Sequence, residues 1–455
     1  MNIVIVGLGK FGMLLTENLA KEDHDIVVID KNPSFVEHAV NTYDVKGFAG
    51  NGAAFATLKS AEVKNYDLLI ATTSSDEVNI LSCLVGSKMG IKHTIARVRN
   101  PEYSSEKDPM LKQIDLGISL ALNPDLETAR EILRIILFPS ATKIEPFANG
   151  RVSLTEVHID ANDGMVGKAL SVLREKNDLS FLVCAVRRQG EVIVPKGDFI
   201  LEANDTIYLA CSTKDLAKVF KKYKMFKDKL KSTMIIGGGR VGYYLAQGLS
   251  ANKVAVKIIE ENPLICQSLS DQLTDVLVLN GNGTNQMMLL EEGLESEDAV
   301  VTLTGYDETN IIISTFAKSK NVKKVVTKVN NSNYDLILNN LGLDSVISAK
   351  EVFANYIIRY VRSLDHANTN TITNLYRFAN NKVEALEFKI SSKASFTGKQ
   401  IKNLKFKDNI LLACIIRDKE VIIPCGNDTI EVDDGVIIIN ATSTINDVAD
   451  IFMEQ

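Results

Sequence analysis

Apolar and polar positions change their spacing along the chain in a regular way. Short runs rich in Val, Ile and Leu alternate with longer segments in which apolar residues recur every three or four positions. The runs are typical of buried parallel strands and the longer segments of amphipathic helices. Strands that alternate with helices predict a doubly wound parallel sheet with helices on both faces. In the first part of the chain the strands are predicted at residues 3–6, 25–30, 45–49, 67–73, 93–98 and 118–122.

Two other patterns accompany this sheet. Residues 124–137 and 348–362 are apolar over wide faces, so we expect two buried helices, each on its own domain or at a subunit interface. Residues 184–210 and 413–440 alternate apolar and polar positions between turn residues, with Pro195 opposite Pro424. This alternation predicts small β-rich modules, each closed by a short helix.

The whole arrangement occurs twice. MNIVIVGLGKFG at residues 1–12 recurs as STMIIGGGRVG at residues 232–242, and GNGAAF at 50–55 recurs as GNGTNQ at 281–286. LIATTSSDEVNI at 69–80 matches VVTLTGYDETNI at 300–311, and IARVRN at 95–100 matches VTKVNN at 326–331. A repeat of this length predicts an α/β protein in which two Rossmann-like N modules alternate with two small α+β C modules. The predicted boundaries give N and C modules at residues 1–140, 141–228, 229–368 and 369–455.

Composition narrows the class of protein. The 455 residues are 45% hydrophobic and 24% charged, as in soluble globular proteins, and the net charge of −6 argues against a general nucleic-acid binder. No apolar run reaches the roughly 18–20 residues of a membrane span and no leader pattern opens the chain, so we expect a protein that is neither secreted nor integral to a membrane. The scattered cysteines and histidines predict buried thiols in a reducing compartment and no metal site. The lysine-rich residues 221–231 predict a solvated linker helix, with attraction to an anionic membrane face as the alternative.

A glycine pattern follows the first strand of each N module. A lone G-x-G-x-x-G is equally compatible with a tight turn, but here it follows an apolar strand and opens a helix. In that context Gly7 permits the turn, Gly9 lets a pyrophosphate approach the backbone, and Gly12 lets helix and strand pack closely. The helix N-terminus then presents free amides and a partial positive charge to the phosphates.

An acidic residue ends the second strand of each N module. Asp30 lies 18 residues after Gly12, and Glu260 occupies the matching position in the second copy. A carboxylate there can accept hydrogen bonds from the adenosine ribose and would repel a 2′-phosphate. The sequence therefore favours NAD(H) over NADP(H), although a solvated acid at a strand end is the alternative reading.

Further candidates follow the other strands. Lys10 and Arg240 could reach a phosphate or simply start an exposed helix, and Asn51 and Asn282 are placed to meet the adenosine end. Residues after the fourth strand could line the ribose or nicotinamide half, while Arg97 and Lys328 end the fifth strand, toward the same crevice or a neighbour. The candidate ligand-binding residues of the first N module are Gly7, Leu8, Gly9, Lys10, Phe11, Gly12, Asp30, Asn51, Thr73, Ser74 and Arg97. Those of the second are Gly237, Gly238, Gly239, Arg240, Val241, Gly242, Glu260, Asn282, Thr304 and, more loosely, Gly305 and Lys328.

These motifs, taken together and in the N–C–N–C order, resemble the TrkA-type regulators of bacterial potassium uptake, which are tandem RCK (regulator of potassium conductance) units. The resemblance covers essentially the whole chain. It implies a cytoplasmic subunit, peripheral on the inner face of the membrane and bound to a Trk-type potassium transporter. It also implies a homo-oligomeric ring, tetrameric in such proteins, in which bound NAD(H), ATP or ADP biases the conformation of the pore. Asn51 and Asn282 depart from the aspartate that the family often carries, which puts any contact assigned to that carboxylate in doubt.

Two rival functions need features that the sequence lacks. An NAD-dependent oxidoreductase needs a proton-transfer group beside the nicotinamide, but His93 and His158 have no histidine at the matching positions of the second half. An NAD-sensing repressor needs a helix-turn-helix and a basic reading face. The sequence therefore predicts a ligand that is sensed through its different affinities for two conformations and is not consumed.

Overall fold

The structure is a computed structural model of the chain. It describes residues 1–22, 24–64, 66–100, 103, 117–139, 141–148, 150–175, 181–225, 230–343, 345–365, 372–379, 382–418, 420–441, 445 and 447–453. These residues form two compact units, unit 1 from Met1–Leu133 and Lys231–Ile358 and unit 2 from Arg134–Leu230 and Arg359–Gln455. Unit 1 thus pairs the two N modules and unit 2 pairs the two C modules. The boundaries predicted at residues 140, 228 and 368 lie outside the described residues and stay predictions.

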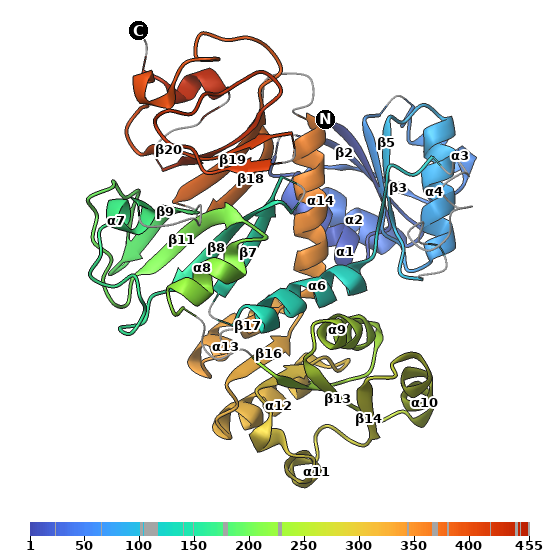
Figure 1. Ribbon diagram of the computed structural model, residues 1–455. Helices are drawn as coiled ribbons and strands as arrows, with labels where there is room; N and C mark the ends of the chain where they lie inside the picture. The colour runs from blue at the N-terminus through green and yellow to red at the C-terminus, as the bar shows by residue number, and fades with distance from the viewer. Residues whose placement is uncertain are drawn as a thin grey trace. The chain divides into compact units, whose positions relative to one another are not determined.

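The first N module is a six-stranded parallel sheet in the order β3-β2-β1-β4-β5-β6. Val4 and Val6 of β1 share a hydrophobic core with residues of α3 and α4, the alternate residues Ile3 and Ile5 belong to the other face, and all four are buried. Figure 1 shows α3 and α4 on one side of this sheet and α1 and α2 on the other, as expected for strands covered on both faces. The elements are β1 (Asn2–Val6), α1 (Lys10–Leu19), β2 (Asp25–Asp30), α2 (Pro33–Tyr43), β3 (Lys46–Ala49), α3 (Phe55–Ser60), β4 (Leu68–Ala71), α4 (Asp76–Lys88), β5 (His93–Arg97) and β6 (Leu120–Leu122).

The second N module repeats this sheet in the order β14-β13-β12-β15-β16-β17, again all parallel. Its elements are β12 (Ser232–Ile236), α9 (Arg240–Ala251), β13 (Ala255–Glu260), α10 (Pro263–Gln272), β14 (Val276–Asn280), α11 (Gln286–Glu291), η2 (Leu294–Ser296), β15 (Ala299–Thr302), α12 (Asp307–Ser319), β16 (Lys324–Lys328), η3 (Ser332–Tyr334), α13 (Asp335–Asn340) and β17 (Ser345–Ile347). In both sheets the strand order reverses beside the first strand, which is where ligands bind on doubly wound sheets.

The C modules are five-stranded antiparallel sheets, in the orders β10-β9-β11-β8-β7 and β18-β19-β22-β20-β21. The first consists of β7 (Ala141–Phe147), β8 (Val152–His158), α7 (Leu170–Glu175), β9 (Phe181–Arg188), β10 (Glu191–Ile193), β11 (Thr206–Ser212) and α8 (Leu216–Lys222). The second consists of β18 (Ile372–Phe378), β19 (Val383–Lys389), η4 (Ile401–Asn403), β20 (Ile410–Arg417), β21 (Glu420–Ile422), β22 (Gly435–Asn440) and η5 (Val448–Ile451). The predicted fold class is confirmed.

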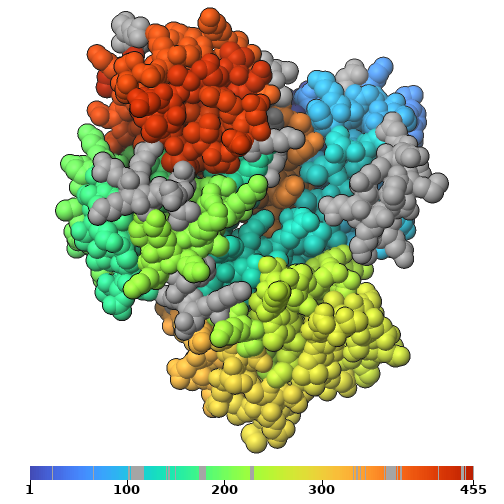
Figure 2. All heavy atoms as spheres, viewed as in Figure 1, coloured from blue at the N-terminus to red at the C-terminus, as the bar shows by residue number. Residues whose placement is uncertain are grey.

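The two C modules share one hydrophobic core within unit 2. The ring centroids of Tyr208 and Phe378 lie 4.6 Å apart, and the Ala148 amide donates to Glu387 Oε2 at 3.1 Å. In the space-filling view the first C module, in green, adjoins the second, in orange-red (Figure 2). The sequence predicted two modules but not this joint core, because strand alternation says nothing about which outer faces meet.

One helix follows each N module in the chain, α6 (Pro124–Leu137) after the first and α14 (Ala349–Asp365) after the second. Both bury apolar residues, as expected. However, the Phe353 ring of α14 packs edge-on against Phe11 of α1 with centroids 5.1 Å apart, and Leu133 of α6 lies against Gly248 of α9. Each helix therefore contacts the other N module of the same chain, an alternative that the sequence analysis did not include.

The structure also bears on the expectations for the cysteines, for the lysine-rich residues 221–231 and for membrane spans. Five cysteines are buried and Cys425 is exposed. The linker helix predicted at residues 221–231 is wrong where it can be checked, since α8 ends at Lys222 and Tyr223, Met225 and Leu230 are buried; residues 226–229 lie outside the described part. None of the helices that the structure describes is long and apolar enough to cross a bilayer.

Candidate functional site

The glycine loops lie at the end of β1 and β12, where the strand order of each sheet reverses. Gly7 and Gly237 have φ angles of +92° and +111°, which disfavour any residue with a side chain. A Cβ on Gly7 would lie 2.7 Å from the Thr73 amide nitrogen, and one on Gly12 would collide with the carbonyl of Gly7. These glycines are therefore required by the fold itself, whether or not a ligand binds.

Gly9 and Gly239 differ from their neighbours in the loops. Each has an ordinary φ, −68° and −64°, and a Cβ added to either would have no heavy atom within 4 Å. Each is also the N-cap of its helix and offers no side chain to the free amides of the first turn. The space beside each backbone is thus open at a helix N-terminus, which is the geometry that accommodates a phosphate.

The acidic residues at the ends of β2 and β13 are tied to the loops. Asp30 accepts the Leu8 amide at 2.6 Å and the Asn32 amide at 2.8 Å, one on each carboxylate oxygen. Glu260 accepts the Gly238 and Asn262 amides at 2.7 and 2.9 Å in the same way. Each oxygen retains a further lone pair that a ribose hydroxyl could use. The Leu8 side chain itself is buried, so only its backbone belongs to the site.

The loops after β4 and β15 are held by asparagines that the sequence analysis missed. Asn79 Oδ1 accepts the Thr73 amide at 2.8 Å and its hydroxyl at 2.7 Å, while Asn79 Nδ2 donates to the carbonyl of Arg97 at 2.9 Å. Asn310 does the same for Thr304 and Lys328 at 2.9, 2.8 and 2.9 Å. Both asparagines are fully buried. Their matched positions in DEVNI and DETNI are the signal that could have found them.

Arg97 and Phe11 contact each other. The Arg97 guanidinium carbon lies 4.7 Å from the Phe11 ring centroid, and Nη1 donates to the carbonyl of Thr73 at 2.8 Å. Burial, followed by the charge of Arg99, lowers the pKa of Arg97, while Arg97 Nε is buried without a hydrogen-bond partner among the described residues. In the second N module Lys328 donates to the carbonyl of Leu303 at 3.2 Å, and burial lowers its pKa.

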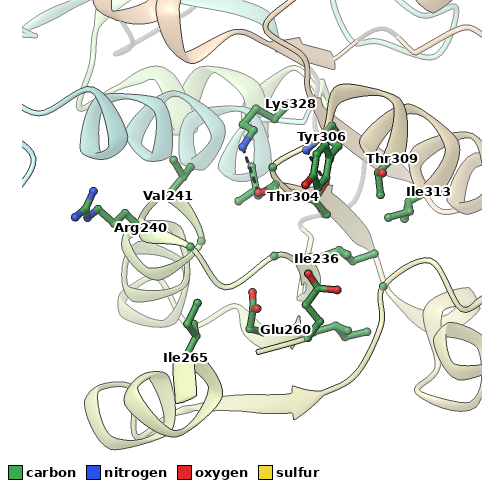
Figure 3. Close-up of a pocket in the computed structure, with 18 of the residues that line it drawn as sticks. Ile236, Arg240, Val241, Glu260, Ile265, Thr304, Tyr306, Thr309, Ile313 and Lys328 are labelled. Carbon is green, nitrogen blue, oxygen red and sulfur yellow. Dashed lines mark hydrogen bonds between the residues drawn. The ribbon is translucent and has the colours of Figure 1, made fainter. Parts of the chain in front are cut away.

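A cavity of about 550 Å³ occupies the second N module, a size typical of small-molecule sites. Figure 3 shows Lys328, Thr304 and Tyr306 along one side of it and Glu260 and Ile265 along the other. Every candidate of that module except Gly238 lines the cavity, namely Gly237, Gly239, Arg240, Val241, Gly242, Glu260, Asn282, Thr304, Gly305 and Lys328. Arg99 and Asp125 of the first N module also line it, which the sequence analysis did not predict.

The remaining candidates have simpler surroundings. Lys10, Arg240 and Ser74 are exposed, as a phosphate or ribose contact would require. Asn51 Oδ1 accepts the Ala53 amide at 3.1 Å and Asn282 Oδ1 accepts the Thr284 amide at 2.8 Å, so both asparagines stabilise turns. The glycine that follows each asparagine, Gly52 and Gly283, packs onto β1 and β12, where a Cβ would collide with Val6 and Ile236.

The residues that line the cavity of the second N module are suited to binding a ligand more than to catalysing a reaction. Its lining has a glycine loop, a helix N-terminus, basic side chains and the carboxylate of Glu260, but no histidine or cysteine. Lys328 is engaged with a carbonyl, and no group of His, Cys, Asp and Glu among the described residues could hold a metal ion. The residues present therefore fit a nucleotide with a phosphate chain.

Fold and site together define a tandem RCK-type protein, with two Rossmann-like sheets that each carry a nucleotide-type cradle and two small antiparallel modules. Residues 3–124 and 233–349 match the TrkA-N domain, and residues 154–224 and 385–453 match the TrkA-C domain. The chain belongs to the TrkA family of Trk system potassium uptake proteins.

Relatives of known name agree with this assignment. "Trk system potassium uptake protein TrkA homolog 1" of Methanosarcina mazei is 33% identical over 99% of this chain and 100% of its own. "Trk system potassium uptake protein TrkA" of Vibrio alginolyticus is 31% identical over 96% of this chain and 95% of its own. Such relatives are potassium uptake proteins, so this chain is not the oxidoreductase that the sequence left as an alternative.

Solved structures share the fold. The structure titled "GsuK channel bound to NAD" has a TM-score of 0.64 at 19% identity and covers 97% of this chain and 77% of its own. The GsuK RCK domain has a TM-score of 0.63 at 19% identity, with 97% and 92% coverage. At this identity the likeness concerns the fold alone.

Proposed function

We propose that this chain is the nucleotide-sensing regulatory subunit of a Trk-type potassium uptake system. NAD(H) binds on the N modules, with ATP and ADP as further ligands. The subunit lies in the cytoplasm on the inner face of the membrane, as a homotetrameric ring attached to a Trk-type transporter. The observation that carries the proposal is the pair of matched cradles, each with an open glycine at a helix N-terminus and a carboxylate one strand away.

Different residues of each site bind different parts of the ligand. The amides after Gly9 and Gly239 receive the pyrophosphate, and Asp30 and Glu260 accept the adenosine ribose hydroxyls. Their negative charge disfavours a 2′-phosphate, which selects NAD(H) over NADP(H). A bound nicotinamide would supply hydride chemistry only beside a proton-transfer group; the cavity of the second N module is lined by no histidine or cysteine, and its Lys328 donates to the carbonyl of Leu303.

Regulation follows from differential binding. A ligand that prefers one ring conformation shifts the equilibrium by the difference in its two affinities and by no more. Couplings of about 1–3 kcal/mol are typical and change an equilibrium by roughly 5–150-fold. GsuK, a channel of the same fold whose structure is known with NAD bound, is a precedent for this arrangement.

Calorimetry with NADH and ATP tests the proposed sites. In Asp30→Ala and Glu260→Ala we expect the affinity of the altered site to fall roughly 10–100-fold, because each change removes charge-assisted hydrogen bonds. Asp25→Ala, at the opposite end of β2, is the matched control and should bind as wild type does. Unchanged nucleotide affinity in both site variants would contradict the assignment, and urea unfolding would show whether either change loosens its loop.

A further inference from the structure

Basic side chains from both N modules gather at the cavity of the second module. Arg240 and Lys328 belong to that module, while Arg99 lies two residues after the end of β5 in the first. Arg97 lies close enough to Arg99 and Arg240 for both charges to lower its pKa, although less than burial does, while Asp125 and Asp76 act in the opposite direction. Like charges held this close favour a polyanion that neutralises them.

Arg99 is held in a position that leaves its terminal nitrogens available. Its Nε donates to Asp125 Oδ2 at 2.8 Å, and its backbone amide is fixed by Asp76 at 2.8 Å. Nη1 and Nη2 make no hydrogen bond with any of the described residues, and the side chain is 34% exposed. Two donors on a fixed guanidinium match the geometry of phosphate oxygens.

The candidate site of the first N module has no matching arginine–aspartate pair. The repeat places Asn330 opposite Arg99, and the register of β6 and β17 places Lys350 opposite Asp125. The Arg99–Asp125 ion pair therefore has no counterpart at the matching positions. The duplication has produced two candidate sites with the same kind of glycine loop but with different residues around it.

We propose that Arg99 is a specificity-determining residue of the second nucleotide site, where it binds the phosphate chain of a nucleotide whose pyrophosphate lies on the Gly237–Gly242 loop. The inference rests on the proposed function. A ligand there contacts both N modules, so its binding is linked to their arrangement. A nucleoside triphosphate gains the most affinity from Arg99, because its phosphate chain carries the most negative charge.

Binding to the intact chain with the first site disabled by Gly9→Ala tests this role. In that background Arg99→Gln should weaken ATP binding roughly 10–100-fold, the loss expected for a charge-assisted hydrogen bond. AMP should lose less, because it lacks the outer phosphates. The matched control is Asn330→Gln in a Gly239→Ala background, where ATP affinity at the first site should not change.

A second variant separates a phosphate contact from a structural role of the ion pair. Asp125→Asn keeps an acceptor for Arg99 Nε but removes a negative charge from the cavity wall. ATP should therefore bind at least as tightly as before, whereas a merely structural pair would make Asp125→Asn as damaging as Arg99→Gln. Equal ATP affinity in wild-type and Arg99→Gln chains would overturn the inference and leave the proposed function standing. Absence of nucleotide binding in the unaltered chain would overturn the proposed function itself.

Discussion

At the scale of single residues, the glycines of each loop serve different purposes. Gly7 and Gly12 are required by the backbone, since a Cβ on either would meet the main chain of Thr73 or Gly7. Gly9 has room for a Cβ and a φ of −68°. The backbone therefore does not require glycine here beyond the modest preference of an N-cap for it over alanine, whereas a methyl group would occupy the space in which we propose that a phosphate binds.

Gly9→Ala and Gly12→Ala should therefore separate binding from stability. Gly9→Ala should lose nucleotide binding at the first site while its free energy of unfolding changes by no more than about 1 kcal/mol, the range of an N-cap substitution. Gly12→Ala should be destabilised by about 3 kcal/mol or more, because backbone atoms must move. Calorimetry and urea unfolding of both variants would check this; undiminished NADH binding by Gly9→Ala would contradict the cradle.

Asn79 provides a second prediction at this scale. Asn79→Ala removes the acceptor of the partly buried Thr73 amide and the side-chain donor to the buried carbonyl of Arg97, so we expect a loss of about 2–4 kcal/mol in the free energy of unfolding. Nucleotide affinity at the first site should fall as well, because the loop after β4 loses its support. Exposed Asn41 on α2 is the control, and Asn41→Ala should change stability by less than about 0.5 kcal/mol. Equal unfolding midpoints for the two variants would contradict this role.

Sequence could predict only part of the site at this scale. Gly7, Asp30 and their counterparts stand at fixed offsets from a strand, and local spacing is enough to find them. Asn79 looks like an ordinary helix residue, and its role depends on two strands that approach it only in the folded sheet. Arg99 belongs to one module and lines the cavity of another, which no pattern within a repeat reveals.

At the scale of elements, one aspartate in each N module ties the beginnings of three strands together. Asp67, just before β4, accepts the Asn2 amide at the start of β1 and the Lys92 ammonium just before β5, at 2.9 and 2.7 Å. Asp298 does the same before β15, with the Lys231 amide and the Lys323 ammonium at 2.7 and 2.8 Å. The pKa of Asp67 is lowered first by the Asn2 amide and then by Lys92, and that of Asp298 first by Lys323.

These lowered pKa values predict a dependence of stability on pH. A carboxylate with a lowered folded-state pKa stabilises the fold fully above its unfolded pKa, near 3.8, and loses that contribution as the pH falls through the folded value. At pH 7 the double variant Asp67→Asn with Asp298→Asn should have a free energy of unfolding lower by about 1 kcal/mol per site. Urea unfolding from pH 7 to below pH 3 should show the gap from wild type closing; a gap independent of pH would contradict this role.

The elements themselves were largely predictable because their signals are local. Residues 25–30 were predicted as a strand and form β2, and residues 124–137 form α6. The strand predicted at 67–73 ends earlier, at Ala71: the Thr72 amide still donates to the carbonyl of Val6, but the Thr73 amide turns away and donates to Asn79 Oδ1. The destination of α6 and α14 was not predictable, since an apolar face does not specify what covers it.

At the scale of the whole molecule, duplication explains the pairing of like modules. The chain runs N–C–N–C, yet the N modules form one compact unit and the C modules another. A nucleotide at the proposed sites would therefore bind within the unit that the two copies of the N module form in one chain. We expect its effect to pass through the arrangement of these copies and not through chemistry on the nucleotide.

Potassium uptake by cells that depend on this chain tests the central claim most directly. The comparison is between the wild-type chain and Gly9→Ala with Gly239→Ala, which should fold normally but bind no nucleotide. At equal protein abundance, we expect uptake in the variant to differ from wild type and to stop following the cell's NADH and ATP levels. Uptake that matches wild type and still follows those levels, in cells whose variant binds neither nucleotide, would contradict the account.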